Sequence, residues 1–288
     1  MSMLVPSAHA RISQLFAIKM RAQSRSLSTL RLQDRVAVVT GASSGLGRAI
    51  ALRYAAEGAC IVCADLQPNI ATKEAENTVT ATHELVRERG GRSFFAKTDV
   101  SDEESMKKLI LAAVQEFGRV DMYVCAALMN TASQYQIFLL TKHEISSMVN
   151  NAAIAPEAHG PLPIYESPTE IFDLTMLVNT RSVYLGCKYA GIQMMKQDHH
   201  SNGDRGWIIN IASILGLVGK AGVIAYSSAK GAVVNMTRTA ALDYAPHRIH
   251  VNAIAPGSQS SRLLFSNRMQ AKLTCNRYSN SNDCCYLE

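Results

Sequence analysis

A run of apolar residues that ends in a glycine-rich turn is the feature that most restricts the fold of this chain. The run RVAVVT, residues 35–40, is apolar almost throughout, as in a parallel strand that is covered on both faces. It leads into the turn Gly41-Ala42-Ser43-Ser44-Gly45-Leu46-Gly47 and then into a helix expected over 47–58. This order predicts the start of a βαβ unit, with a turn whose backbone N–H groups can approach a pyrophosphate closely.

The alternation of short β-rich runs and longer helical stretches continues beyond this unit. Further strands are expected at 60–65, 92–100, 206–213 and 248–256, with another that begins near Arg119. Further helices are expected over 71–91, from a capping box at Ser101-Asp102-Glu103-Glu104 to Phe117, over 168–197 and over 226–245. Parallel strands need crossover helices, so the pattern predicts an α/β, doubly wound parallel sheet of the Rossmann type in a single domain. We expect this domain to span 33–262, between an N-terminal extension, 1–32, and a weakly ordered tail, 263–288.

The charge of the chain is concentrated in the N-terminal extension. Five of the 29 Lys and Arg residues and none of the 23 acids precede Asp34, so the net charge of +6 falls to +1 for the remainder. This distribution argues against nucleic-acid binding. No apolar run approaches the ~20 residues of a membrane span, which predicts a soluble protein with no membrane partner. The extension is Arg- and Ser-rich and acid-free, as in a mitochondrial transit peptide; a disordered extension or a wrongly assigned start is the alternative, so the expected location is mitochondrial or cytoplasmic.

The seven cysteines form no framework of disulfides or metal ligands. Cys60 and Cys63 make a lone C-x-x-C inside an apolar run, without the second pair that a zinc site needs. We therefore expect no metal site and reduced thiols in an intracellular compartment.

Acidic residues end two of the expected strands beside the glycine-rich turn. Asp65 ends the second strand, where a carboxylate can accept hydrogen bonds from adenosine ribose hydroxyls and repel a 2′-phosphate. Because no basic residue just before Gly45 or just after Asp65 reverses this preference, the sequence favours NAD over NADP. A simple cap of the following loop is the alternative role for Asp65. Asp99-Val100 ends the third strand at the same edge, where adenine would lie.

The strongest chemical signal is the pair Tyr226 and Lys230. Four residues apart on a helix, they share one face, and a neighbouring ammonium favours the anionic form of a phenol whose usual pKa is about 10. Such a lowered pKa suits a general acid/base. Ser213, at the end of the fifth strand, and Asn179, in the preceding helix, are able to bring further polar groups to the same pocket.

With these residues together, the chain resembles the short-chain dehydrogenase/reductase family. The matching features are Thr40 to Gly47, Asp65, Asp99, the Asn-Asn-Ala-Ala segment at 150–153, Asn179, INIAS ending at Ser213, Tyr226-x-x-x-Lys230, and VNAIAPG ending at Pro256-Gly257. The resemblance covers about residues 33–262 with one interruption.

The resemblance implies hydride transfer between a nicotinamide and a carbinol or carbonyl carbon. Tyr226 would exchange the proton, and Ser213 would hydrogen-bond the substrate oxygen. Lys230 would lower the pKa of Tyr226 and hold the nicotinamide ribose, while Asn179 would fix a water molecule. The implied cofactor contacts are Gly41, Ser43, Ser44, Gly45, Leu46, Gly47, Asp65, Asp99, Val100, Asn151, Ala152, Tyr226, Lys230, Pro256 and Gly257. A homo-oligomer, dimer or tetramer, is also implied.

Two departures from the family pattern concern short segments. Asn-Asn-Ala-Ala stands in place of the more usual Asn-Asn-Ala-Gly. After Pro256-Gly257, Ser261 takes the position of a threonine that reaches the nicotinamide amide, and no convincing last strand follows. Substrate enclosure and the usual oligomer contacts are the properties that these departures put in question.

The third departure divides the fourth strand. The family pattern Asp-x-x-Val-Asn-Asn-Ala leaves no room between acid and asparagines, whereas Asp121 and Asn150 are 29 positions apart here. One interpretation is a functional insertion near 122–147, which a loop can tolerate because closure entropy grows slowly with length. A second is a duplicated strand, although MYVCAA lacks the asparagines. The third is a translated intron: Met122-Tyr123-Val124 can encode the splice donor GTATGT and Ser147 the acceptor AG, and excision would join Asp121 through one isoleucine to Met148.

Two functions from different classes follow. The first is an oxidoreductase that uses NAD(H) on a secondary alcohol or ketone, with Asn179, Ser213, Tyr226 and Lys230 as the catalytic set. The second is a catalytically impaired nucleotide-binding or interaction product of a gene that retains an intron or has wrongly assigned exon boundaries. The two are distinguished by NADH binding and by turnover.

Overall fold

A six-stranded parallel sheet runs through the part of the chain that the computed structural model describes, residues 30–69, 80–125, 154–158 and 160–257. Its strands are β1 (Val36–Thr40), β2 (Cys60–Asp65), β3 (Ser93–Lys97), β4 (Met122–Cys125), β5 (Gly206–Ile211) and β6 (Ile249–Ile254). The spatial order is β3-β2-β1-β4-β5-β6, and every neighbouring pair is parallel. The order reverses between β1 and β4, as in a doubly wound Rossmann-type sheet, so the predicted fold class is confirmed.

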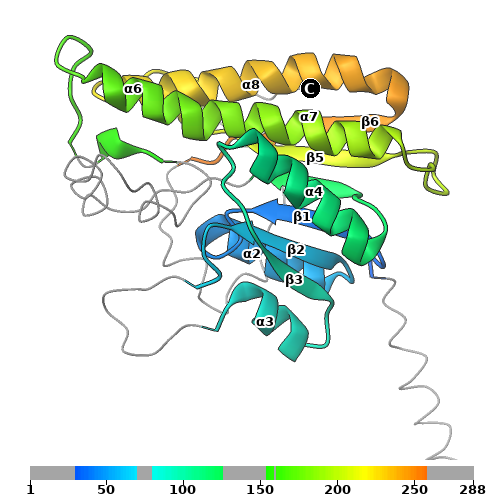
Figure 1. Cartoon of the computed structure of the whole chain (residues 1–288). Coiled ribbons are helices and arrows are strands. Elements are labelled where there is room, and N and C mark those ends of the chain that lie inside the picture. Colours follow the sequence, from blue (N-terminus) through cyan, green and yellow to red (C-terminus); the bar gives the residue numbers. More distant parts are fainter. Residues whose placement is uncertain (1–29, 70–79, 126–153, 159, 258–288) are drawn as a thin grey trace, which may run out of the picture.

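Helices alternate with the strands along the chain, as expected for βαβ units (Figure 1). The α-helices are α2 (Gly45–Ala56), α3 (Thr82–Glu88), α4 (Glu103–Phe117), α6 (Thr169–Met176), α7 (Ser182–Met195) and α8 (Ile224–Tyr244). A π-helical turn, η3 (Leu177–Arg181), joins α6 to α7, so the single helix expected over 168–197 contains a bulge. Short 3-10 turns are η2 (Pro156–Ala158), η4 (Ile214–Gly216) and η5 (Ala245–His247).

Side chains of successive strand residues enter two different cores. Val36 and Val38 pack with residues of α4, α7 and α8, whereas Ala37 and Val39 pack with residues of α2 on the opposite face. Figure 1 shows α7 and α8 crossing the sheet side by side near β5 and β6. Coverage of both faces explains why the strand sequences read as continuous apolar runs.

The residues MYVC form the fourth strand of the sheet, which corrects the predicted extent of the interruption. Met122 and Val124 face the α2 core, and Tyr123 and Cys125 face the other core, so the segment satisfies the period of two that a central strand needs. Residues 122–125, expected to belong to the interruption, are therefore part of the sheet. The second candidate strand end, Val149–Asn151, lies outside the described residues, and the intron hypothesis stays a prediction.

Tyr123 packs closely against a glycine of α7. The ring is fully buried, and a Cβ built on Gly186 of α7 would lie 2.4 Å from its Cε1 atom. This close approach brings α7 onto β4, beside the strand end that faces the candidate site.

The N-terminus of α4 differs in detail from the predicted capping box. Asp102, not Ser101, is the N-cap residue, and its Oδ1 accepts a hydrogen bond of 2.7 Å from the N–H of Ser105. The Ser101 hydroxyl instead donates to Asp99 Oδ1 over 2.7 Å. An aspartate satisfies a helix N-terminus as well as serine does, so the pattern allows a shift of one residue.

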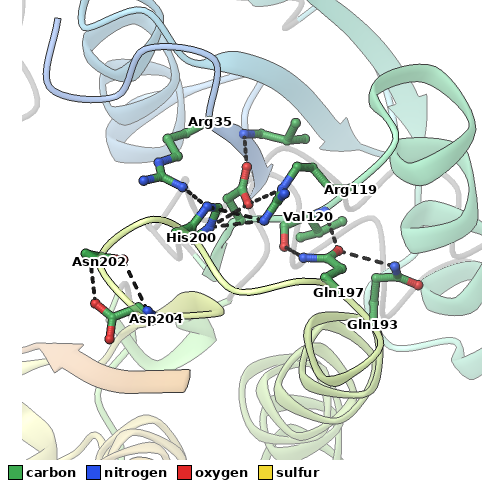
Figure 2. A network of polar contacts seen from close by, with 10 residues as sticks. Arg35, Arg119, Val120, Gln193, Gln197, His200, Asn202 and Asp204 are labelled. Atoms are coloured by element: carbon green, nitrogen blue, oxygen red, sulfur yellow. Dashed lines mark hydrogen bonds and ion pairs between the residues drawn. The ribbon is translucent and has the colours of Figure 1, made fainter. Parts of the chain in front are cut away.

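A charged network closes the N-terminal edge of the sheet, opposite the edge where β1 meets the glycine-rich turn (Figure 2). Buried Asp121 accepts the N–H of Val36 over 2.8 Å and forms an ion pair with Arg119, at 2.5 Å. Its Oδ1 also lies 2.9 Å from Nε2 of His200. Nδ1 of His200 faces the guanidinium of Arg35. Burial lowers the pKa of His200, so the neutral ring donates to Asp121 through Nε2 and accepts from Arg35 through Nδ1. The network ties the starts of β1 and β4 to the segment before β5.

Within the described ranges, no helix combines the length and the apolar character that a membrane span requires. The extension 1–29 and residues 258–288 lie outside these ranges, so the transit-peptide and tail predictions are untested.

Candidate active site

The glycine-rich turn forms the first wall of the candidate site. Gly41 and Gly45 have φ angles of 63° and 50°, in the left-handed region where glycine carries no steric penalty. A Cβ at Gly47 would lie 2.2 Å from the carbonyl oxygen of Gly41, so α2 begins against the backbone of the turn. The first turn of α2 contains no acid, and its positive dipole end is therefore not neutralised from within the helix.

Asp65 lies directly beside this turn, at the carboxyl end of β2. Its Oδ2 accepts the N–H of Ser43 over 3.1 Å, and its Oδ1 accepts the N–H of Leu66 over 2.8 Å. The side chain is buried, and this burial outweighs the two hydrogen bonds and raises the pKa of Asp65 to about 6. Each carboxylate oxygen can accept a further hydrogen bond, which leaves capacity for ribose hydroxyls.

The segment after β3 is attached to the same corner. Thr98 donates its N–H to the carbonyl of Asp65 over 2.8 Å, which places Asp99 and Val100 next to the end of β2. Asp99 Oδ1 accepts two hydrogen bonds from Ser101, one from N–H and one from the hydroxyl. Asp99 is thus held in a tight turn at the edge where the sequence predicts the adenine site.

Ser213 follows β5 at the other side of the sheet reversal. Its side chain is buried, and its Oγ accepts the N–H of Leu215 over 3.2 Å at the start of η4. The next residue, Ile214, donates its N–H to the carbonyl of Pro256 over 3.0 Å. Pro256, which follows β6, is therefore joined through the backbone to the residue after Ser213.

Tyr226 and Lys230 lie on one face of α8, as their spacing predicts. Nζ of Lys230 is 5.8 Å from the centroid of the Tyr226 ring and donates to the carbonyl of Ile211 over 2.9 Å. Ser213 is close enough to the phenol of Tyr226 to lower the pKa of that phenol. A Cβ at Gly216 would lie 2.6 Å from the backbone of Lys230, so η4 packs directly onto the helix at this point. Ser213, Tyr226 and Lys230 therefore lie close together at the start of α8.

The pKa of Tyr226 is raised, which corrects the lowering expected from the neighbouring ammonium. Burial raises it, and the nearby side chain of Ser213 offsets only part of that effect. Lys230 itself is fully buried, and burial lowers its pKa to about 8. The lysine is therefore still mostly protonated at pH 7, but it loses its charge at a lower pH than an exposed lysine does.

Asn179 anchors the start of the described segment after the interruption. Its buried side chain accepts the N–H of Ile154 over 2.7 Å and donates to the carbonyl of Ile154 over 2.6 Å. Because Asn179 belongs to the π-helical turn between α6 and α7, the bulge aims the amide at this backbone. Asn151 and Ala152, expected in the cofactor groove, lie outside the described residues.

Sequence reasoning missed Glu157, whose buried carboxylate contacts the helix that carries Tyr226. Its oxygens accept the N–H groups of Ala225, over 3.0 Å, and of Tyr226, over 2.9 Å. The partners are 68 and 69 residues away, and a single glutamate after a proline gives no sequence signal for such a contact.

The residues present fit a dinucleotide. The turn has room only for glycine at Gly47, its helix presents a positive N-terminus, and a carboxylate stands beside it at Asp65. The turn and Asp65 would hold the pyrophosphate and the adenosine ribose. Lys230 and the Pro256-Gly257 backbone would border the nicotinamide end.

Comparisons with known proteins agree with this architecture. The family model for short chain dehydrogenase matches residues 35–144 and 139–271. The 2-(R)-hydroxypropyl-CoM dehydrogenase of Xanthobacter autotrophicus is 33% identical over 224 residues, which cover 78% of this chain and 74% of that protein. The cis-4-hydroxycyclohexanecarboxylate dehydrogenase of Sinomonas cyclohexanicum is 34% identical over 232 residues, which cover 80% and 76% of the two chains.

A solved structure extends the likeness from sequence to fold. The crystal structure of levodione reductase superposes with a TM-score of 0.60 at 27% identity, covering 79% of this chain and 72% of that chain. With the family model matched over more than half of its length, the chain belongs to the short-chain dehydrogenase family.

Proposed function

We propose that this chain is an oxidoreductase that transfers a hydride between NAD(H) and a secondary alcohol or ketone, with Tyr226 as the general acid/base. The observation that carries the proposal is the placement of the Tyr226 ring beside the buried ammonium of Lys230, with Ser213 near enough to the phenol to lower its pKa. The hydride donor or acceptor would be the nicotinamide ring, bound across the sheet reversal.

The substrate class is supported by the names of two relatives. The 2-(R)-hydroxypropyl and cis-4-hydroxycyclohexane groups in these names each carry a hydroxyl on a secondary carbon. The preference for NAD over NADP rests on Asp65, whose carboxylate would repel a 2′-phosphate. Because the pKa of Asp65 is about 6, this repulsion is nearly complete at pH 7 and is lost as the pH falls through 6.

The proton chemistry follows from the environment of the phenol. Because burial raises the pKa of Tyr226, the phenol is protonated at neutral pH and donates its proton to a carbonyl oxygen during reduction. Ser213 would hydrogen-bond the same oxygen as negative charge develops on it. In the oxidative direction the phenol must first lose its proton, so the rate of oxidation should rise with pH.

A tyrosine-to-phenylalanine exchange tests this function directly. Tyr226→Phe should lower turnover by about 10²- to 10⁴-fold, the usual contribution of a general acid/base, while NADH fluorescence titration shows that the variant still binds the cofactor. Tyr165→Phe is the matched control, because Tyr165 is 83% exposed and outside the site. Full turnover by Tyr226→Phe would refute the mechanism. Wild-type protein that binds NADH but turns over no alcohol or ketone of a broad panel would instead favour a nucleotide-binding module.

A further inference from the structure

The catalytic helix α8 begins without a cap from its own N-cap residue. Val223 occupies the N-cap position and makes no side-chain hydrogen bond to the first turn. A helix N-terminus leaves its first N–H groups without partners inside the helix, and a Ser, Thr, Asp or Asn at the N-cap usually satisfies one of them. The cap of α8 must therefore come from elsewhere in the fold.

Glu157 supplies this cap from η2. Its two oxygens accept the N–H groups of Ala225 and Tyr226, the second and third residues of the helix, over 3.0 and 2.9 Å. The carboxylate is only 3% exposed, so its negative charge faces the positive end of the helix dipole with little screening by water.

The same short segment is fixed at its other end by the π-helical turn. Asn179 holds both backbone groups of Ile154, three residues before Glu157. Leu162 then donates its N–H to the carbonyl of Gly222 over 3.2 Å, just before α8 begins. Glu157 is thus the middle of three contacts, made by Ile154, Glu157 and Leu162, that connect the π-helical turn at Asn179 to the start of α8.

We propose that Glu157 is a positioning residue for Tyr226. This inference rests on the proposed function, in which the Tyr226 phenol exchanges the proton. One of the two capped amides belongs to Tyr226 itself, so the carboxylate fixes the backbone from which the phenol reaches Ser213. Loss of the cap frees the first turn of α8 and misplaces the hydroxyl, while Lys230, one turn further into the helix, keeps its place.

The test is Glu157→Gln, which keeps the size of the side chain. A glutamine oxygen accepts one amide, but its NH₂ group meets the other N–H donor, and the charge is lost. We expect kcat to fall at least about tenfold, because small misplacements of a reacting group are costly, with the KM for NAD changed less than about twofold. Hydrogen exchange at the amides of Ala225 and Tyr226 should accelerate. Glu170→Gln, which removes an exposed acid from the first turn of α6, is the matched control.

A second-site change separates positioning from any direct contact with substrate. Val223→Thr, nearly isosteric, adds a hydroxyl at the N-cap that accepts from the same amides. In the Glu157→Gln background it should restore kcat and amide protection. Absence of such rescue, or unchanged kcat and protection in Glu157→Gln, overturns the proposal. If Glu157→Gln alone does not fold, recovery of folding and turnover in the double variant supports the proposal, and continued unfolding overturns it. Wild-type protein without turnover would refute the proposed function, whereas the exchange of the two amides would still decide whether Glu157 caps α8.

Discussion

The buried carboxylate of Asp65 should make cofactor affinity depend on pH. Its pKa is about 6, so roughly nine tenths of the protein carries the charge at pH 7 and roughly one tenth at pH 5. If ribose hydroxyls bind the ionised form, the Kd for NADH rises about tenfold over this interval. Asp65→Asn removes the charge and one of the two hydrogen bonds that the carboxylate accepts from the N–H groups of Ser43 and Leu66. Because hydrogen bonds to a charged group contribute about 1.5–3 kcal/mol, this variant should bind NADH about tenfold to a hundredfold more weakly. The same substitution should also reduce the difference between the Kd values for NADH and NADPH.

NADH and NADPH fluorescence titrations from pH 5 to pH 7.5, at constant ionic strength, measure these effects. The Asn variant should give a nearly flat pH profile, and Asp34→Asn, at an exposed aspartate, should keep the wild-type profile. A wild-type Kd that changes less than about twofold across this range, or an Asn variant as steep as the wild type, would refute the role given to Asp65.

Three further predictions concern packing and buried charges. Gly186→Ala should lower the free energy of unfolding by about 1–3 kcal/mol, because its Cβ would overlap the Tyr123 ring; Gly219→Ala, with open space around it, should change it little in the same denaturant titrations. The pKa of His200 is lowered in the folded protein, whereas in the unfolded chain it is near 6.5, so the unfolded chain binds a proton first on acidification. The contribution of His200 to stability is therefore complete above about pH 6.5 and decreases below it. His200→Gln should reduce this decrease. The pKa of Lys230 is about 8 in the folded protein and about 10.4 in the unfolded chain, so between these pH values the unfolded chain binds more protons. The free energy of unfolding should therefore rise with pH in this range, and Lys230→Met should make the rise smaller. An unchanged slope in either variant would contradict the corresponding assignment.

The strands that sequence alone placed well are those bounded by unambiguous turns. The runs expected at 35–40 and 60–65 match β1 and β2 within one residue, because each is a continuous apolar segment that ends at a turn or an acid. The fourth strand was harder. The family motif directs attention to the asparagines at 150–151, while the alternation of Met122, Tyr123, Val124 and Cys125 between two cores decides which residues the sheet uses.

The candidate site shows the same division between local and distant effects. The spacing of Tyr226 and Lys230 gives their shared face, since both lie on one helix. The rise in the pKa of Tyr226 is caused by burial against other elements, and the spacing of two residues on one helix does not predict that burial. The contacts of Glu157 and of Asp121 join residues that are far apart in the sequence, so no local sequence pattern predicts them.

The π-helical turn at 177–181 sets the phase between two packing surfaces. One extra residue in a helix rotates everything after it by about 100° relative to an uninterrupted α-helix. Ile171 and Thr175 of α6 are buried before the turn, and Val183 and Cys187 of α7 are buried after it. Deletion of one residue from the turn would keep the helix continuous but would rotate one of these pairs toward solvent. The position of the Asn179 amide therefore depends on the packing of both α6 and α7. Conversion of the π-helical turn into regular α-helix would remove the core contacts of one of these two helices.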